Sequence, residues 1–291
     1  MHTHIFWYPD HLSDALVDDS LASKRVKAER SGGRAFLVRE DRHANDALPD
    51  IHYEATKTAD KVIVFGIQAP AVGFNVPNEI VATYVKRDPE RLEGWASIDP
   101  NNPSALDELD HCVNDLGLKG LKVAPVYQHW NPQDKSNWAL FRQCSKLSLP
   151  VLIHQGATYP STAKLEWGKP LQLERLAMEL PELRMIIAHL GHPWEEDVVA
   201  LIRKSPNLYS DVSALHFRPW RLWQAMATAY EYGVTHKLLF GSDFPNASTA
   251  DALAGLRDVN KVVEGTSLPH IPSDVIEQII SDNWSSFTQG T

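Results

Sequence analysis

A regular alternation of short apolar runs and amphipathic stretches, beginning near residue 59, constrains the fold of this chain most strongly. Each apolar run is rich in Val, Ile and Leu, and Gly, Pro or Asn mark the joins. Strands that are apolar along their whole length are typical of a parallel sheet covered by helices, because both faces are buried. The predicted strands span residues 61–67, 92–98, 117–126, 149–156, 184–191, 207–214 and 237–245.

Amphipathic stretches follow most of these runs and are predicted to be helices. Residues 104–116 begin with Ser104 as a helix cap and repeat apolar residues at helical spacing. The same pattern predicts further helices over 136–147, 169–180, 194–204, 218–232, 250–264 and 273–287. An alternation of this kind predicts a (β/α)8 TIM barrel, which requires one more strand.

The remaining strand is expected at the N-terminus. Residues 1–4 resemble the end of a strand, whereas a strand usually has about five or six residues. We therefore expect a short or truncated first strand, with a native start upstream of Met1 as the favoured explanation. Residues 5–58 are a long polar connection of the kind that often forms a lid, with helices expected over 10–22 and 51–59. We predict a single domain over 1–291.

Composition and charge argue against several classes of protein. No run of about 18 apolar residues is present, and the first ten residues lack the features of a signal peptide, so we expect no membrane segment. A net charge of −9 without a cluster of Lys and Arg argues against nucleic acid as a partner. The two cysteines form no C-x-x-C motif, which favours a reducing, cytoplasmic compartment.

Side chains that bind metals or transfer protons gather at the C-terminal ends of the predicted strands, where TIM-barrel enzymes carry their active sites. These side chains are His2, His4, His154, His189 and Asp243. Residues i and i+2 of a strand point to the same face, so both imidazoles of the H-T-H motif are expected to face the barrel mouth. Together with His154 and the Asp243 carboxylate, they suit Zn²⁺ or another divalent metal that activates a water molecule.

Four motifs in this order resemble the amidohydrolase superfamily: H-T-H, L-I-H-Q-G, I-A-H-L-G and F-G-S-D-F-P. The resemblance is closest to the amidohydrolase-related branch, which includes aminocarboxymuconate-semialdehyde decarboxylase, resorcylate decarboxylase and several lactonases. It extends nearly end to end through residues 91–100, 117–123, 206–213 and 282–284.

The resemblance implies a role for each of these side chains. His2, His4, His154 and Asp243 correspond to the metal ligands of the family, and His189 corresponds to its proton-transfer group. This branch is mainly mononuclear, so the resemblance implies one divalent metal ion, with Zn²⁺ expected first and Mn²⁺ as the alternative.

Other residues near the predicted mouth could contact a substrate. Binuclear relatives bridge two metals through a carboxylated lysine on the fourth strand, where Lys119 and Lys122 lie. Lys122 is open to three interpretations: a solvated or ion-paired lysine, a carboxylated metal ligand, or a group that holds an anionic substrate. Further candidates for shaping the substrate pocket are Trp7, Tyr8, His192, His216, Arg218 and Trp220.

Three functions remain open at this point. The first is hydrolysis of a lactone, ester or amide, in which Asp243 or His189 removes a proton from a metal-activated water. The alternative is non-oxidative decarboxylation of a small aromatic or unsaturated acid; such decarboxylases tend to have a glycine-rich run after the sixth-strand histidine, and L-G-H-P-W here favours hydrolysis. The third is a non-catalytic barrel that binds a metal or ligand. The expected partner is a small-molecule substrate, and a homodimer is an open expectation.

Overall fold

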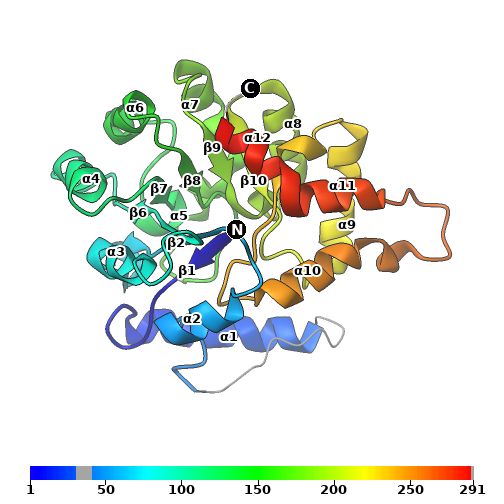
Figure 1. Ribbon diagram of the computed structural model, residues 1–291, viewed down its shortest axis with the longest axis horizontal. Helices are drawn as coiled ribbons and strands as arrows, with labels where there is room; N and C mark the ends of the chain where they lie inside the picture. The colour runs from blue at the N-terminus through cyan, green and yellow to red at the C-terminus, as the bar shows by residue number, and fades with distance from the viewer. Residues whose placement is uncertain (31–40, 290–291) are drawn as a thin grey trace.

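The computed structural model describes residues 1–30 and 41–289, and its strands follow one another around a central axis with helices outside (Figure 1). The barrel strands are β1 (His2–His4), β2 (Val62–Phe65), β5 (Leu92–Gly94), β6 (Ala96–Ser97), β7 (Leu121–Val123), β8 (Val151–Ile153), β9 (Met185–Ile187), β10 (Leu208–Asp211) and β11 (Leu238–Leu239). Each hydrogen-bonded neighbour pair among them is parallel.

Two junctions close the ring of strands. Trp95 separates β5 from β6, which together form the third barrel strand, and its backbone N–H donates to the Val64 carbonyl (2.9 Å). At the other junction Thr3 of β1 bridges Phe244, just beyond β11, and the His4 N–H donates to the Phe244 carbonyl (2.9 Å). The predicted (β/α)8 TIM barrel is therefore confirmed, including its short first strand.

Most helices cover the outer face of the barrel (Figure 1). The helices of the described residues are α1 (Asp14–Arg30), α2 (Pro49–Ala55), α3 (Asn78–Val85), α4 (Ala105–Asn114), α5 (Pro125–Gln128), α6 (Ala139–Lys146), α7 (Glu174–Glu179), α8 (Glu195–Lys204), α9 (Pro219–Glu231), α10 (Thr249–Arg257), α11 (Ser273–Glu277) and α12 (Asn283–Gln289). Within the described residues, no helix has the length and apolar character needed to cross a membrane.

The predicted helices and the observed ones differ mainly in the first third of the chain. The first helix was expected over 10–22 but spans Asp14–Arg30, and residues 31–40 of the long connection lie outside the described residues. Helix α3 and the hairpin of β3 (Gln68–Ala69) and β4 (Phe74–Asn75) were not predicted. The two hairpin strands have two residues each, too few for an apolar period to distinguish them from a loop.

Large apolar side chains fill the barrel interior. The interior cluster comprises Ile63, Phe65, Trp95, Leu152, Ile186, Ala188, Tyr209, Leu239 and Phe287. Phe287 of α12 packs edge-on against Tyr209 with ring centroids 4.9 Å apart, and the Arg184 guanidinium, just before β9, donates to the Phe287 carbonyl (2.6 Å). Helix α12 therefore covers the N-terminal end of the barrel, which leaves the C-terminal end for the polar residues.

Lys237 provides a test of the barrel's outer packing. Its buried Nζ donates to the carbonyl oxygens of Ile202 (2.9 Å), Ser205 (2.7 Å), Pro206 (3.1 Å) and Leu208 (3.2 Å), at the end of α8 and the start of β10. Because Lys237→Met leaves these carbonyls without a donor, we expect the free energy of unfolding to fall by about 2–3 kcal/mol.

Urea denaturation measures this change, and Lys57→Met is the control. Lys57 forms an exposed ion pair with Glu54 (3.0 Å), so its replacement is expected to cost less than about 0.5 kcal/mol. Equal losses in the two variants would contradict a stabilising role for the Lys237 contacts.

Candidate metal centre and active site

The H-T-H motif forms β1, and its side chains alternate as strand geometry requires. Thr3 points outward, where its hydroxyl donates to the Ile63 carbonyl (2.8 Å). The imidazoles of His2 and His4 both point to the interior, with their Nε2 atoms 3.3 Å apart. The two histidines therefore share one side of the strand, as their spacing predicts.

Asp243 brings a carboxylate to the same place from the loop after β11. Its Oδ1 lies 3.0 Å from His4 Nε2 and 3.4 Å from His2 Nε2. Asp243 has a φ of 55°, in the left-handed region, and its N–H donates to the His2 carbonyl (3.0 Å). Within the described part of the chain, His2, His4 and Asp243 form a group whose potential metal-binding atoms lie within 4.8 Å of one another.

His154 follows β8 directly and lies beside this group rather than inside it. Its backbone N–H donates to the Val123 carbonyl (2.9 Å), which fixes the residue at the strand end. The ring packs edge-on against His189 (5.2 Å) and against Tyr127 (5.0 Å). Its Nε2 is buried and has no hydrogen-bond partner among the described residues. A buried nitrogen without a partner is costly unless a ligand or a metal completes it.

His189 lies in a short 3₁₀ turn (Ala188–Gly191) after β9, in a left-handed conformation with φ 57°. Its Nδ1 lies 2.7 Å from Ser213 Oγ, and the Ser213 hydroxyl itself donates to Asp211. Ser213 Oγ must then accept a hydrogen bond from Nδ1–H, which leaves Nε2 as the unprotonated nitrogen of the neutral ring. This Nε2 faces Asp243, with Oδ2 4.0 Å away.

Asp211, at the end of β10, is a site residue that the sequence analysis missed. Its Oδ2 accepts a hydrogen bond from His2 Nδ1 (2.9 Å), and its Oδ1 accepts one from the His189 N–H (3.0 Å). Burial alone would raise the pKa of Asp211, but the His2 and His189 imidazoles have the larger combined effect and hold the pKa below its ordinary value, so the carboxyl is ionised. A carboxylate in this position orients an imidazole whose other nitrogen binds a metal. The strand-end rule that selected Asp243 also applies to Asp211.

Burial sets the protonation states that a metal site requires. It lowers the pKa of His2, His4 and His154, and that of His189 to about 4, so these imidazoles are neutral at pH 7. Burial raises the pKa of Asp243, but His189 and His4 hold it well below its ordinary value. Neutral imidazoles and an ionised carboxylate are the forms that bind divalent metals.

Lys122 points into the barrel from the middle of β7. Its side chain is buried, and its Nζ lies 4.9 Å from the centre of the Phe65 ring. Nζ has neither a hydrogen bond nor an ion pair among the residues that the structure describes, which argues against the ion-paired interpretation. Burial lowers the pKa of Lys122 to about 8. Lys119, by contrast, is exposed.

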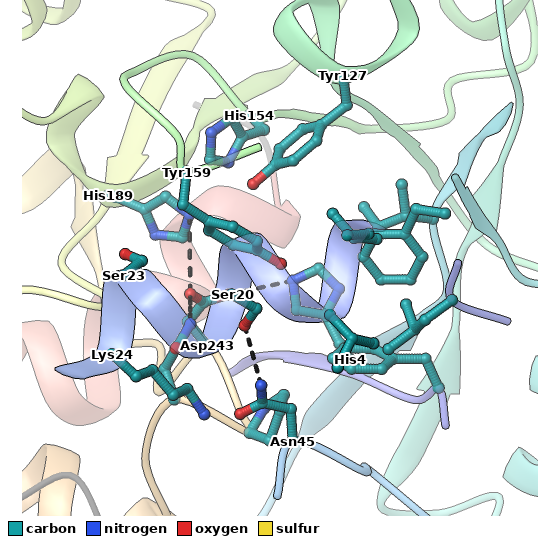
Figure 2. A pocket seen from close by; sticks show the side chains of 18 of the residues that line it. His4, Ser20, Ser23, Lys24, Asn45, Tyr127, His154, Tyr159, His189 and Asp243 are labelled. Carbon is teal, nitrogen blue, oxygen red and sulfur yellow. Dashed lines mark hydrogen bonds and ion pairs between the residues drawn. The ribbon is translucent and has the colours of Figure 1, made fainter. Parts of the chain in front are cut away.

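A cavity opens between these polar groups and α1, which crosses the barrel mouth (Figure 2). One part, here called the apolar lobe, is lined by Phe6, Leu12, Leu16, Val17, Ile67 and Phe74. The other part, here called the polar lobe, is lined by Thr158, His192, Phe217 and Arg218. His154, His189 and Asp243 border both lobes. The long connection after β1 therefore covers the site, as its length suggested.

Of the predicted substrate contacts Lys122, His192 and Trp7, two line the cavity. Lys122 lines the apolar side of the cavity, and His192 lines the polar lobe. Trp7 lies outside both sets of lining residues, because its indole N–H donates to Asp10 (2.7 Å) at the surface. The prediction for Trp7 is corrected: Phe6 lines the cavity instead, while Trp7 is partly buried against the hydrophobic core.

The barrel carries a group of histidines and aspartates at its strand ends that could hold a metal ion, and comparison with known proteins identifies the family to which such a barrel belongs. A sequence profile described as amidohydrolase matches residues 1–283, and the chain belongs to this family.

The chain is 32% identical over 78 residues to 2-amino-3-carboxymuconate-6-semialdehyde decarboxylase of Dictyostelium discoideum, a match covering 26% of this chain and 22% of that protein. It is 26% identical over 144 residues to gamma-resorcylate decarboxylase of a Rhizobium species, covering 39% and 43%. The matches thus span less than half of either relative.

Solved structures show the same fold over nearly the whole chain. An uncharacterised TIM-barrel protein from Bordetella bronchiseptica has a TM-score of 0.72 at 17% identity, covering 99% of this chain and 98% of that one. The manganese complex of 5-carboxyvanillate decarboxylase from Novosphingobium aromaticivorans has a TM-score of 0.65 at 14% identity, covering 99% and 95%. A probable 2-pyrone-4,6-dicarboxylic acid hydrolase from Acinetobacter baumannii has a TM-score of 0.65 at 16% identity, covering 99% and 98%.

Proposed function

We propose that this protein is a metal-dependent, non-oxidative decarboxylase of a small aromatic or unsaturated carboxylic acid. The observation that carries the proposal is the cavity itself, in which the histidine and aspartate group and the unpartnered Lys122 Nζ face an apolar lobe. The names of the two decarboxylases described above support this reaction, whereas a further relative, matched at 27% identity over 135 residues, is named as a 2-keto-4-carboxy-3-hexenedioate hydratase. Hydrolysis, which the sequence favoured, becomes the second candidate, supported by the similar fold of a probable pyrone hydrolase.

The side chains that would hold the metal are His2, His4, His154 and Asp243. The site fits such an ion, because three of these groups already converge and the fourth has a buried Nε2 that lacks a partner among the described residues. Nitrogen and oxygen ligands accept Zn²⁺ and Mn²⁺ alike. We propose Mn²⁺, because similar decarboxylase structures contain manganese. When bound, the ion would polarise the oxygen atoms of the substrate as a Lewis acid.

Lys122 would bind the substrate carboxylate, and the apolar lobe would hold the ring or unsaturated chain. The Lys122 ammonium has no other anionic partner within the described residues, so a carboxylate would neutralise a buried charge. Phe6, Phe74, Leu16 and Val17 would limit the access of water to the bound ring or chain in this lobe. Exclusion of water strengthens the electrostatic interactions in the site.

His189 would transfer the proton that replaces the carboxylate. Its Nε2 accepts the proton of a hydroxyl group next to the carboxylate and returns it to the carbon that carries the carboxylate. The bond from this carbon to the carboxylate then breaks, carbon dioxide leaves, and its electron pair restores the conjugated system as a phenolate or enolate. Solvent protonates that oxygen, so one proton is taken up per turnover. Ser213 holds His189 Nδ1 at 2.7 Å and keeps Nε2 towards the cavity.

A turnover screen with the manganese-loaded protein tests this function. Hydroxybenzoates with a hydroxyl group next to the carboxylate are incubated in parallel with lactones and esters, and products are identified by chromatography. We expect loss of the carboxyl group from at least one acid, with no reaction in chelator-treated protein and recovery after Mn²⁺ is restored. Opening of the lactones with every acid left intact would instead establish the hydrolase.

A further inference from the structure

The polar lobe of the cavity contains a cationic side chain for which the decarboxylation step has no use. We propose that Arg218 in this lobe binds a second carboxylate, so that the substrate is a small dicarboxylic acid with both groups on one aromatic or unsaturated frame. The inference rests on the proposed function for the first carboxylate and names the substrate class more closely.

Arg218 is held in place but is not neutralised. Its guanidinium lies 4.3 Å from the centre of the Phe217 ring, and its Nη1 donates to the Ala214 carbonyl (2.6 Å). No carboxylate lies within ion-pair distance of it in residues 1–30 and 41–289. Burial lowers its pKa to about 10, so it stays charged at neutral pH. A half-buried cation without a counter-ion beside a cavity favours an anionic ligand.

The guanidinium has the right donors for a carboxylate. Arginine offers five N–H groups in a planar fork, and only one bond, to the Ala214 carbonyl, is made within the described structure. Two parallel N–H groups of such a fork match the two oxygens of a carboxylate. Ala214 has a φ of 55°, a left-handed conformation that is unfavourable for alanine and that directs its carbonyl to Arg218.

The acidic residues near the polar lobe interact with groups other than Arg218. Glu195 Oε1 lies 2.5 Å from His192 Nδ1, and Glu195 Oε2 lies 4.0 Å from Arg221 on the exposed side of α9. Asp243 borders the lobe but belongs to the proposed metal ligands. Arg218 therefore supplies the positive charge that remains for a ligand in this lobe.

Another part of the wall of the polar lobe is fixed by backbone contacts. The Ala157 N–H donates to the His192 carbonyl (2.8 Å), and a Cβ at Gly156 would lie 2.7 Å from the same oxygen. His192 and Thr158 thus line the lobe from a tightly packed segment. A preformed wall lowers the entropy cost of binding a ligand between the metal site and Arg218.

Binding of unreactive acids tests the proposal without turnover. Calorimetry on the manganese-loaded protein compares isophthalate and terephthalate, which have two carboxylates, with benzoate, which has one. We expect the better dicarboxylate to bind about 10- to 100-fold more tightly than benzoate. In Arg218→Gln the ratio of dicarboxylate affinity to benzoate affinity is expected to fall below about threefold, while the affinity for benzoate itself stays unchanged.

Arg221→Gln is the matched control, because Arg221 lies in the first turn of α9, which begins directly after Arg218, has a partly exposed side chain and lines no part of the polar lobe. It is expected to keep the wild-type ratio, and Arg218→Lys, which keeps the charge without the fork, is expected to give an intermediate one. Equal affinity of the wild type for all three acids overturns the proposal even if Arg218→Gln does not fold. A wild-type preference that persists in Arg218→Gln overturns it as well.

The binding experiment can fail or succeed independently of the test for decarboxylation. An Arg218-dependent preference in a protein that releases no carbon dioxide would keep the second carboxylate site and overturn the reaction. Carbon dioxide release without such a preference would keep the reaction and overturn the site.

Discussion

Replacing His189 with asparagine is expected to lower kcat for carbon dioxide release by about 10³-fold while the metal content stays near that of the wild type. The reason is geometric. His189 Nε2 lies 4.0 Å from Asp243 and faces the cavity, while Nδ1 is held by Ser213, so the ring can exchange a proton with a substrate. An amide in this place keeps the polarity but cannot take up and return a proton.

Steady-state kinetics and elemental analysis of the same preparation measure the two quantities separately. His43→Asn is the control, since His43 pairs with Asp46 at the surface and lies outside the residues that line the cavity. The control is expected to retain wild-type kcat. If His189→Asn kept kcat within about tenfold of the wild type, its proposed role in proton transfer would be wrong.

Replacing Asp243 with alanine is expected to weaken Mn²⁺ binding at least about 100-fold, because it removes the only carboxylate of the proposed ligand set. Its Oδ1 lies within 3.4 Å of both H-T-H imidazoles, whereas the nearby Asp211 carboxylate already accepts hydrogen bonds from His2 Nδ1 and the His189 N–H. The affected quantity is the dissociation constant of the metal, which competition with a fluorescent chelator measures.

Variants of two other aspartates serve for comparison. Asp211→Asn keeps all four proposed metal ligands but weakens the contact that orients His2, so Mn²⁺ affinity is expected to fall about 10- to 100-fold. Asp50→Asn changes an exposed carboxylate that pairs with Arg87 and is expected to leave metal binding unchanged. Wild-type affinity in Asp243→Ala would show that the metal binds elsewhere.

The barrel could be predicted from the sequence because its physical signal is local. Strands such as 151–153 and 185–187 are apolar on both faces, and this composition is uncommon outside parallel sheets. The H-T-H motif predicted two imidazoles on one face for the same reason, since strand parity depends only on the backbone. The grouping of strand-end residues followed from the barrel topology.

The rest of the site depends on contacts that sequence spacing does not contain. Asp211 acts through His2, 209 positions earlier in the chain, and the unpartnered state of Lys122 is visible only once its neighbours are placed. Trp7 was chosen because it follows the H-T-H motif, but it lines neither lobe of the cavity. The reaction also could not be read from the ligand set, because one metal site supports hydrolysis and decarboxylation alike; the loop L-G-H-P-W was too weak a guide to separate them.

The most direct test of the central claim uses a hydroxybenzoate labelled with carbon-13 in its carboxyl group. The manganese-loaded protein is expected to convert this label to carbon dioxide, one molecule for each molecule of phenol formed, and the chelator-treated protein is expected to produce none. A label that stays in the aromatic acid across substrates with one and two carboxylates, while manganese is bound, would contradict the account.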